Sequence, residues 1–197
     1  MKSEWVYPQD FPVLRHHQEL LLNQKSCVLW MTGLSGSGKT TLAKSLHKML
    51  YDYGYFSAVM DGDNMRSGLC EDLGFSLEDR MENIRRVASV ARYLADNGCI
   101  VICSFISPTT ASRNLAKKII GSGDFLEVFI DTPLYICEQR DVKGLYQKAR
   151  AGIIKDFTGI GSPFETPACP WVSITTDNQS IEEATTSLFN NLLTIIS

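Results

Sequence analysis

The chain has 197 residues, 44% of them hydrophobic and 21% charged, with a formal net charge of -3. This length suits one α/β domain with a sizeable core, and the slight acidity argues against a protein built mainly to coat nucleic acid. No apolar run approaches the roughly 20 residues of a membrane span, and the first residues lack the order of a signal peptide. We therefore expect a cytoplasmic protein whose partners include neither nucleic acid nor a membrane.

Residues 1–26 are interpreted as an N-terminal arm. Pro8 and Pro12 precede a short amphipathic helix around 14–22, which we expect to pack on the rest of the chain or on a partner. Residues 27–197 are interpreted as a single domain, because strand and helix patterns alternate along them without internal repeats, low-complexity tracts or a linker.

The stretch Gly33-Leu34-Ser35-Gly36-Ser37-Gly38-Lys39-Thr40 matches G-x-x-x-x-G-K-[ST] at every fixed position. An apolar strand, 27–31, precedes it, and a helix that starts with Thr41 and runs to about Tyr53 follows, which is the context of a phosphate-binding loop. Its glycines allow the backbone to turn tightly against a polyphosphate, and the loop N–H groups and helix N-terminus attract the anion. We expect Lys39 at the β- and γ-phosphates and Thr40 on Mg²⁺, so the pattern predicts a nucleoside triphosphate site.

The rest of the chain continues the alternation. Further strands are predicted at 56–60, 99–103, 125–130 and 172–175, and helices at 81–95, 109–120, 134–140 and 180–196. A continuously apolar strand such as 99–103 is typical of a sheet buried on both faces. The pattern therefore predicts a P-loop nucleoside-triphosphate hydrolase or kinase fold, with a mostly parallel five-stranded sheet covered by helices on both faces.

Two carboxylates follow the strand at 56–60. Asp61 and Asp63 lie where open α/β sheets place their ligands, and they could reach magnesium or take a proton from an acceptor hydroxyl. The alternative is turn chemistry, because Asp-Gly and Asp-Asn are common turn residues. Their position after a buried strand favours the functional interpretation.

A basic segment and two aromatic residues suggest where an acceptor binds. Residues 141–170 are polar, rich in Gly and Pro, and basic, which favours a mobile lid over a solvated surface loop. Arg66 and Arg80 lie near Phe75 in sequence, and Phe157 lies in the lid. Arginine forks bind phosphate-like oxygens and phenylalanine stacks on bases, although each residue alone could be a surface charge or a core aromatic.

Several longer motifs resemble those of the adenylyl sulfate kinase (APS kinase) family. They are DGDNMRSGL at 61–69, DLGFS at 72–76, DRMENIRR at 79–86, SFISP at 104–108, EVFIDTP at 127–133, CEQRD at 137–141, KGLY at 143–146, ARAG at 149–152 and KDFTGI at 155–160. The resemblance covers most of the chain, from about Cys27 to Pro167. It implies transfer of the γ-phosphoryl group of ATP to the 3′-hydroxyl of adenylyl sulfate, which yields PAPS and ADP.

The resemblance also implies roles for individual residues. Asp63 would act at the acceptor hydroxyl, Asp61 would lie nearer the magnesium, with Thr40 as the other metal ligand, and Arg140 would lie against the ATP adenine. Ser107 matches a serine often described as a phospho-intermediate, although direct in-line transfer needs no protein nucleophile. The remaining residues expected at the acceptor are Asn64, Arg66, Phe75, Arg80, Asn83, Ile106, Lys143, Leu145 and Phe157, of which Phe75 and Phe157 would sandwich the adenine.

The motif after Pro108 departs from the family. Thr109-Thr110 and Ser112-Arg113 stand where the family usually has Tyr-Arg and Asp-Arg, which leaves open a kinase of this type that acts on another nucleotide conjugate. A nucleotide-binding switch without an acceptor reaction is a further alternative, but no guanine-specificity motif supports it. The sequence also leaves open whether the chain forms a homodimer and whether it associates with a sulfurylase.

Overall fold

The computed structural model describes residues 11–197, so residues 1–10 of the arm, with Pro8, lie outside the described residues. Five parallel strands form one sheet in the order β2-β3-β1-β4-β5. Their bounds are β1 Val28–Thr32, β2 Ser57–Asp61, β3 Ile100–Ser104, β4 Phe125–Ile130 and β5 Val172–Ile174. The predicted five-stranded sheet is confirmed, and it is parallel throughout.

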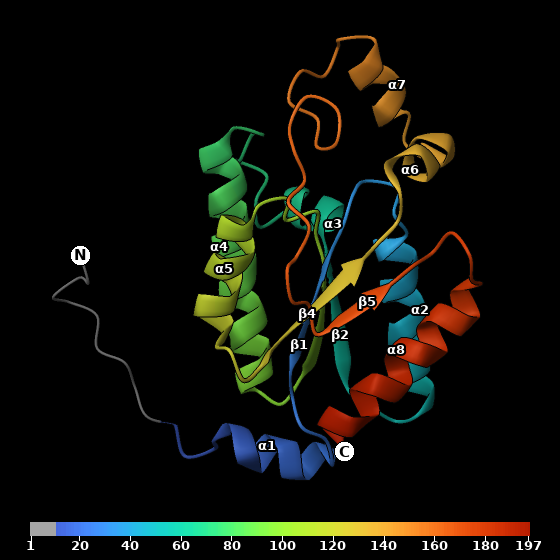
Figure 1. Cartoon of the computed structure of the whole chain (residues 1–197). Helices are drawn as coiled ribbons and strands as arrows, with labels where there is room; N and C mark the ends of the chain where they lie inside the picture. The colour runs from blue at the N-terminus through green and yellow to red at the C-terminus, as the bar shows by residue number, and fades with distance from the viewer. Residues whose placement is uncertain (1–10) are drawn as a thin grey trace, which may run out of the picture.

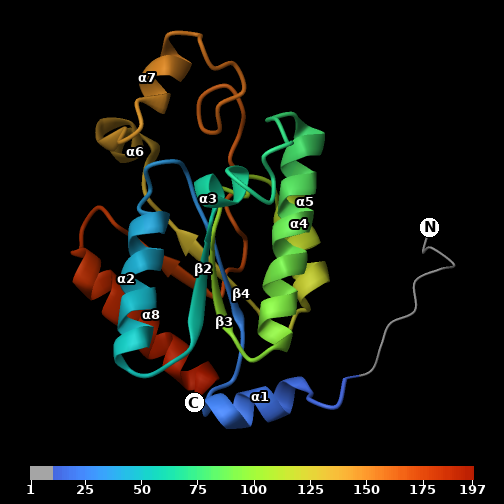
Figure 2. The same ribbon diagram turned by 180° about the vertical axis from the view of Figure 1, so that it is seen from behind.

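The helices form two layers on the sheet and a group above its carboxyl edge (Figures 1 and 2). Helices α2 (Lys39–Asp52) and α8 (Ile181–Ile196) cover one face, and α4 (Leu77–Asp96) and α5 (Thr110–Ile120) cover the other. The short helices α3 (Gly62–Arg66), α6 (Leu134–Arg140) and α7 (Leu145–Arg150) lie at the end where the strands finish, and α1 (Arg15–Leu22) lies at the opposite end.

Strand β1 divides the core into two halves. Leu29 and Met31 pack toward α2 and α8, whereas Val28 and Trp30 pack toward α4 and α5. Successive side chains of a strand point to opposite faces, so a strand covered on both sides must be apolar throughout, and β1 is fully buried. β1 pairs with β3 on one side and with β4 on the other, which centres the glycine loop that follows it on the sheet's carboxyl edge.

Three elements differ from the sequence prediction. Helix α4 begins at Leu77 instead of 81, because the hydroxyl of Ser76 accepts a hydrogen bond from the Asp79 N–H and caps it. The polar connection after β2 contains α3, and the lid contains α7. Both are short helices of five and six residues, in which tertiary contacts outweigh a weak local pattern.

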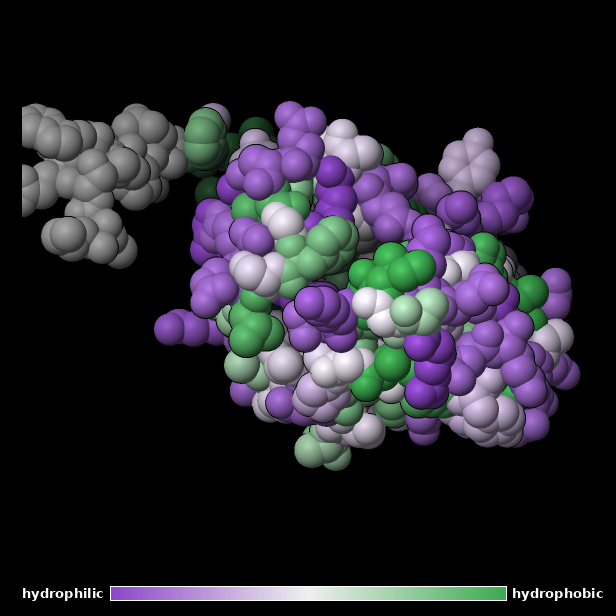
Figure 3. Space-filling model, turned by 90° about the horizontal axis from the view of Figure 1, so that it is seen from above, coloured by the Kyte–Doolittle hydropathy of each residue, from purple (hydrophilic) through white to green (hydrophobic). Residues whose placement is uncertain are grey.

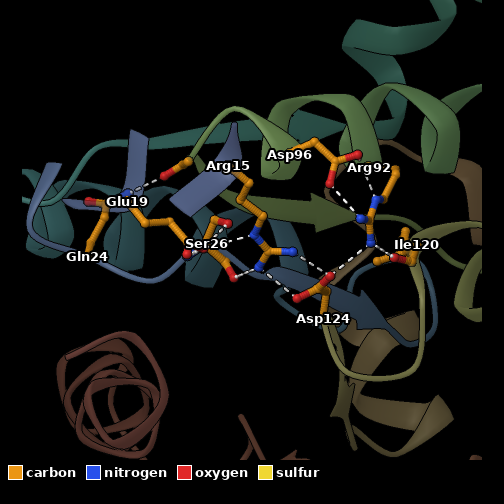
Figure 4. A network of polar contacts seen from close by, with 9 residues as sticks. Arg15, Glu19, Gln24, Ser26, Arg92, Asp96, Ile120 and Asp124 are labelled. Atoms are coloured by element: carbon orange, nitrogen blue, oxygen red, sulfur yellow. Dashed lines mark hydrogen bonds and ion pairs between the residues drawn. The ribbon is translucent and has the colours of Figure 1, made fainter. Parts of the chain in front are cut away.

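Helix α1 is held on the domain by ion pairs (Figure 4). The guanidinium of Arg15 makes two 2.7 Å bonds to the Asp124 carboxylate, which also accepts from Arg92 at 2.9 Å. Arg15 in turn pairs with Glu19. The Arg15 contact lowers the pKa of Asp124, and the network places the described part of the arm on the domain.

Within residues 11–197, no helix is long and apolar enough to cross a membrane.

Candidate active site

The glycine loop has the backbone that the motif requires. Gly36 and Gly38 have φ angles of 74° and 101°, which residues with a Cβ rarely adopt. A Cβ on Gly33 would lie 2.7 Å from the carbonyl oxygen of Ile130, and one on Gly36 would lie 3.0 Å from that of Cys137. The loop therefore fits closely against β4 and α6, and α2 begins directly after it with Gly38 as N-cap.

Lys39 lies inside the loop, with only 8% of its surface exposed. Its ammonium donates hydrogen bonds to the carbonyl oxygens of Gly33 at 2.9 Å and Leu34 at 2.7 Å. Burial lowers the pKa of Lys39 to about 8, because a charged group is costly away from water. A polyphosphate in the loop would supply the counter-charge that this ammonium needs.

An oxygen cluster lies beside the loop, formed by the ends of β2 and β3 and the start of α2. The Thr40 hydroxyl donates to Asp61 Oδ2 at 2.7 Å, and Ser104 Oγ lies 3.4 Å from Thr40 Oγ1. Hard oxygen donors of this kind suit Mg²⁺, which proteins commonly hold through one or two carboxylates together with substrate phosphates. Among residues 11–197, no group of three or more His, Cys, Asp or Glu side chains that could hold a metal ion is found. The Thr40 and Asp61 oxygens would suit a Mg²⁺ ion that takes its other ligands from substrate phosphates and water.

Asp63 is the second carboxylate, and it lies in the first turn of α3. Its N–H donates to Asp61 Oδ1 at 3.1 Å, so Asp61 caps this helix as well as accepting from Thr40. Asp61 therefore has a structural role as the N-cap of α3 besides the functional role predicted for it. The Asp63 carboxylate forms an ion pair with Lys143, which lies at the start of the lid. Asn64 is exposed on the same short helix.

Phe75 lies beside two of the predicted arginines. The residue is 68% exposed, and the guanidinium carbons of Arg66 and Arg80 lie 4.3 and 5.8 Å from the centroid of its ring. Arg80 also donates to the carbonyl oxygens of Phe75 at 2.9 Å and Asp156 at 3.1 Å. The Arg80 side chain therefore links Phe75 to Asp156, the residue that precedes Phe157.

Asn83 lies on the second turn of α4 and is buried, but its side-chain Nδ2 has no hydrogen-bond partner. A buried donor without a partner costs about 1–3 kcal/mol, so an unpaired amide of this kind needs an explanation. A ligand that accepts a hydrogen bond from Asn83 would remove that cost.

Phe157 is only 8% exposed and packs within the lid. Its ring meets the edge of Tyr146 at a centroid distance of 4.9 Å and an interplanar angle of 83°. The surrounding cluster also contains Cys137 and Ala149, with Leu34, Leu134, Leu145, Ile154 and Ile160 packed against it. Residues 145–160 therefore pack into a small apolar cluster shared with α6 and Leu34 of the glycine loop, whereas their composition predicted a loop-rich segment.

Ser107 is buried at 3% exposure and adopts a φ of 43°. Its Oγ accepts a hydrogen bond of 2.9 Å from the indole N–H of Trp30, and its carbonyl oxygen accepts one of 3.0 Å from Arg113. The preceding carbonyl, that of Ile106, accepts from Thr32 at 2.7 Å. These contacts make Ser107 a structural part of a strained turn, and they leave its hydroxyl engaged in the interior.

Arg140 lies against the glycine loop and the end of β5. It donates to the Gly36 carbonyl at 3.3 Å, and to the hydroxyl and carbonyl oxygens of Thr176 at 2.8 and 2.6 Å. The hydroxyls of Thr176 and Thr132 both donate to the Ser37 carbonyl, at 2.9 and 3.0 Å. Neither threonine is among the residues predicted from the sequence to bind a ligand. They follow β4 and β5 at the edge of the sheet where such folds bind ligands, and this position could have identified them from the sequence.

The carboxyl-edge face of the molecule is mixed in character. Figure 3 shows hydrophobic side chains gathered near the middle of this face, with hydrophilic ones around them. A hollow of about 650 Å³ lies between the end of β4, Leu34 of the glycine loop and residues 159–166. None of the residues predicted to bind the acceptor lines this hollow.

A family model, a curated relative and two solved structures point to one family. The family model described as adenylylsulphate kinase matches residues 25–175. An adenylyl-sulfate kinase of Marinobacter nauticus is 52% identical over 179 residues, which cover 91% of this chain and 90% of the relative. The structure of a Mycobacterium tuberculosis APS kinase in complex with AMPPNP and APS has a TM-score of 0.83 and 47% identity, covering 86% of this chain and 98% of that one. A hexameric APS kinase from Thiobacillus denitrificans has a TM-score of 0.66 and 28% identity, covering 87% of this chain but 29% of its own.

Proposed function

The chain belongs to the adenylylsulphate kinase family, and we propose that it transfers the γ-phosphoryl group of ATP to the 3′-hydroxyl of adenosine 5′-phosphosulfate. The products are PAPS and ADP. The Mycobacterium tuberculosis relative was solved with AMPPNP and APS together, which supports one site for an ATP-like donor and another for APS.

The contact between Thr40 and Asp61 is the observation that carries this proposal. The 2.7 Å bond joins the phosphate-binding loop to the strand end that bears Asp63. Thr40 and Asp61 would hold Mg²⁺ on the donor phosphates, directly or through water, and the metal would offset their negative charge. Asp63 lies two residues from Asp61, where it can serve the acceptor. Donor and acceptor chemistry therefore meet at the end of β2.

The protein has little covalent chemistry to perform in this transfer. The acceptor 3′-oxygen bonds to the γ-phosphorus, the bond from that phosphorus to the bridging oxygen of ADP breaks, and Asp63 takes the hydroxyl proton. Lys39 stabilises the charge on the transferring group, since positioning and electrostatics supply most of the catalysis in phosphoryl transfer. Lys143 on the lid pairs with Asp63 in this structure, and it can turn to the acceptor's anionic groups when the acceptor binds.

The acceptor is proposed to bind between α4 and the lid. Arg66 and Arg80 would bind its phosphosulfate, and the unpaired Asn83 amide would donate to its ribose or phosphate oxygens. Phe75 and Phe157 would stack on its adenine, which requires the lid to present one face of Phe157. On the donor side, Arg140 would lie against the ATP adenine and the 33–41 segment would hold the phosphates.

The decisive experiment is an acceptor panel incubated with ATP and Mg²⁺, with products identified by mass spectrometry. We expect adenylyl sulfate to gain one phosphoryl group as ADP appears. Transfer only to another nucleotide conjugate would favour the second candidate, which the Thr109-Thr110 departure supports. ADP release without any acceptor would instead favour a nucleotide-binding switch.

The remaining functional assignments are also proposals. Residues 27–197 would act as one kinase domain with 1–26 as an arm, and the chain would work in the cytoplasm. The hexameric Thiobacillus denitrificans relative supports self-association in general, so we propose at least a homodimer. Association with a sulfurylase would place a supplier of the acceptor beside the kinase.

A further inference from the structure

Tyr146 connects the lid to the glycine loop. It lies in the first turn of α7, is 3% exposed, and donates its hydroxyl to the carbonyl oxygen of Ser35 at 2.9 Å. Burial raises the pKa of this hydroxyl, so it keeps its proton and remains a donor. The two partners are 111 residues apart in the sequence.

The Ser35 carbonyl belongs to a peptide unit whose other side, the Gly36 N–H, would face a phosphate bound in the glycine loop. In a trans peptide the C=O and the following N–H point in opposite directions, and the N–H of this unit is that of Gly36. The N–H groups of this loop are the donors that cradle phosphate. The Tyr146 bond therefore fixes the plane, and hence the direction, of a phosphate-binding N–H.

The same tyrosine touches the aromatic residue proposed for the acceptor. Its ring meets Phe157 at 4.9 Å in an edge-to-face contact, a geometry that contributes about 0.5–1.5 kcal/mol beyond burial. Leu34 packs on this cluster from the glycine loop, and a Cβ on Gly159 would lie 3.1 Å from its Cδ2. The donor loop thus forms one wall of the apolar core that holds Phe157.

We propose that Tyr146 is a positioning residue that couples occupancy of the phosphate-binding loop to the placement of Phe157. Phosphate on the Gly36 N–H polarises the peptide and strengthens the Tyr146 bond to its carbonyl, since hydrogen bonds in a chain reinforce one another. A firmer Tyr146 then holds Phe157 for the acceptor. Coupling of binding energies is reciprocal, so the acceptor also tightens the nucleotide. The acceptor half of this inference rests on the proposed function.

The test compares Tyr146→Phe, which removes only the hydroxyl, with Tyr135→Phe as a matched control. Tyr135 lies on α6 with 60% exposure, and within residues 11–197 its hydroxyl forms no hydrogen bond. The first measurement is hydrogen exchange of residues 145–160, with and without AMPPNP and Mg²⁺. The second is the affinity for adenylyl sulfate with and without AMPPNP, from which the coupling factor follows.

In the parent chain and in Tyr135→Phe we expect AMPPNP to slow exchange across residues 153–160 and to tighten adenylyl sulfate. In Tyr146→Phe the protection should be lost, and the coupling factor should fall roughly twofold to tenfold, the usual contribution of one hydrogen bond. Adenylyl sulfate affinity in the absence of nucleotide should stay within about twofold, a result that general loosening of the lid would not produce.

Unchanged protection and coupling in Tyr146→Phe would overturn the inference, as would a parent chain in which AMPPNP protects nothing in the lid. The exchange measurement uses AMPPNP alone, so it judges Tyr146 even if adenylyl sulfate does not bind. Failure of adenylyl sulfate to bind while lid protection still depends on Tyr146 would instead reject the proposed acceptor and retain the coupling between loop and lid.

Discussion

Phe157→Ala tests whether the lid contributes directly to acceptor binding. Stacking of a base on an aromatic side chain contributes about 1–3 kcal/mol by alanine substitution, a value from single-stranded nucleic acids. We therefore expect the dissociation constant for adenylyl sulfate to rise roughly tenfold to a hundredfold. The affinity for ATP without acceptor should change little. Of the residues predicted to bind the nucleotide, only Leu34 packs against the described cluster that contains Phe157.

The structure also predicts where stability is lost. Removing a buried phenylalanine side chain costs about 3–5 kcal/mol, which in the main core of a chain this size would lower the melting temperature by about 6–20 °C. Phe157 instead belongs to a lid cluster separate from the two clusters on the sheet. The main unfolding transition should therefore move far less, while hydrogen exchange across residues 145–160 accelerates.

Equilibrium titration with adenylyl sulfate, ATP titration and hydrogen exchange measure these effects together. Phe164→Ala is the matched control, since Phe164 stacks on Phe129 at 5.9 Å in the segment after Phe157 and is not proposed to touch the acceptor. The reasoning is refuted if Phe157→Ala weakens ATP and spares the acceptor, which would place Phe157 on the donor side. Equal losses of acceptor affinity in both variants would show that lid packing, and not stacking, is responsible.

Three further outcomes are expected. Asp63→Asn should lower kcat far more than it raises KM, because it keeps the shape and removes the base; steady-state kinetics showing only a raised KM would make Asp63 a positioning residue. Ser107→Ala should keep substantial activity. Its free energy of unfolding should fall by about 1–3 kcal/mol, because the buried Trp30 N–H loses its hydrogen-bond acceptor. An inactive but folded variant, together with phosphoserine trapped in the parent, would contradict direct transfer. Since burial lowers the pKa of Lys39 from 10.5 to about 8, the ammonium that phosphates need is present below pH 8 and lost above it. ATP affinity should therefore fall between pH 8 and 10 in the parent, and a Lys39→Met chain should bind weakly without this dependence.

Local patterns were sufficient for the sheet and the donor loop. Apolar strands, amphipathic helices and the 33–40 motif each depend on neighbours within a few residues, because strand alternation, helical spacing and glycine backbone geometry are short-range effects. Each strand therefore begins and ends within one residue of its predicted bounds. Local patterns also placed Thr40 in the loop motif and Asp61 after a strand, whereas the 2.7 Å contact between them is a finding of the structure.

The contacts that assemble the acceptor side come from distant segments and had no local signal. Lys143 pairs with Asp63 across 80 residues, and Arg80 reaches Asp156 across 76. Whether Ser107 faced the site or the interior depended on Trp30 and Arg113, which approach it from β1 and α5. Such contacts are decided by how helices cross the sheet and how the lid folds back over the loop. The burial of Phe157 and the bond from Tyr146 to Ser35 are therefore properties of the tertiary structure, because only packing brings the lid core against the glycine loop.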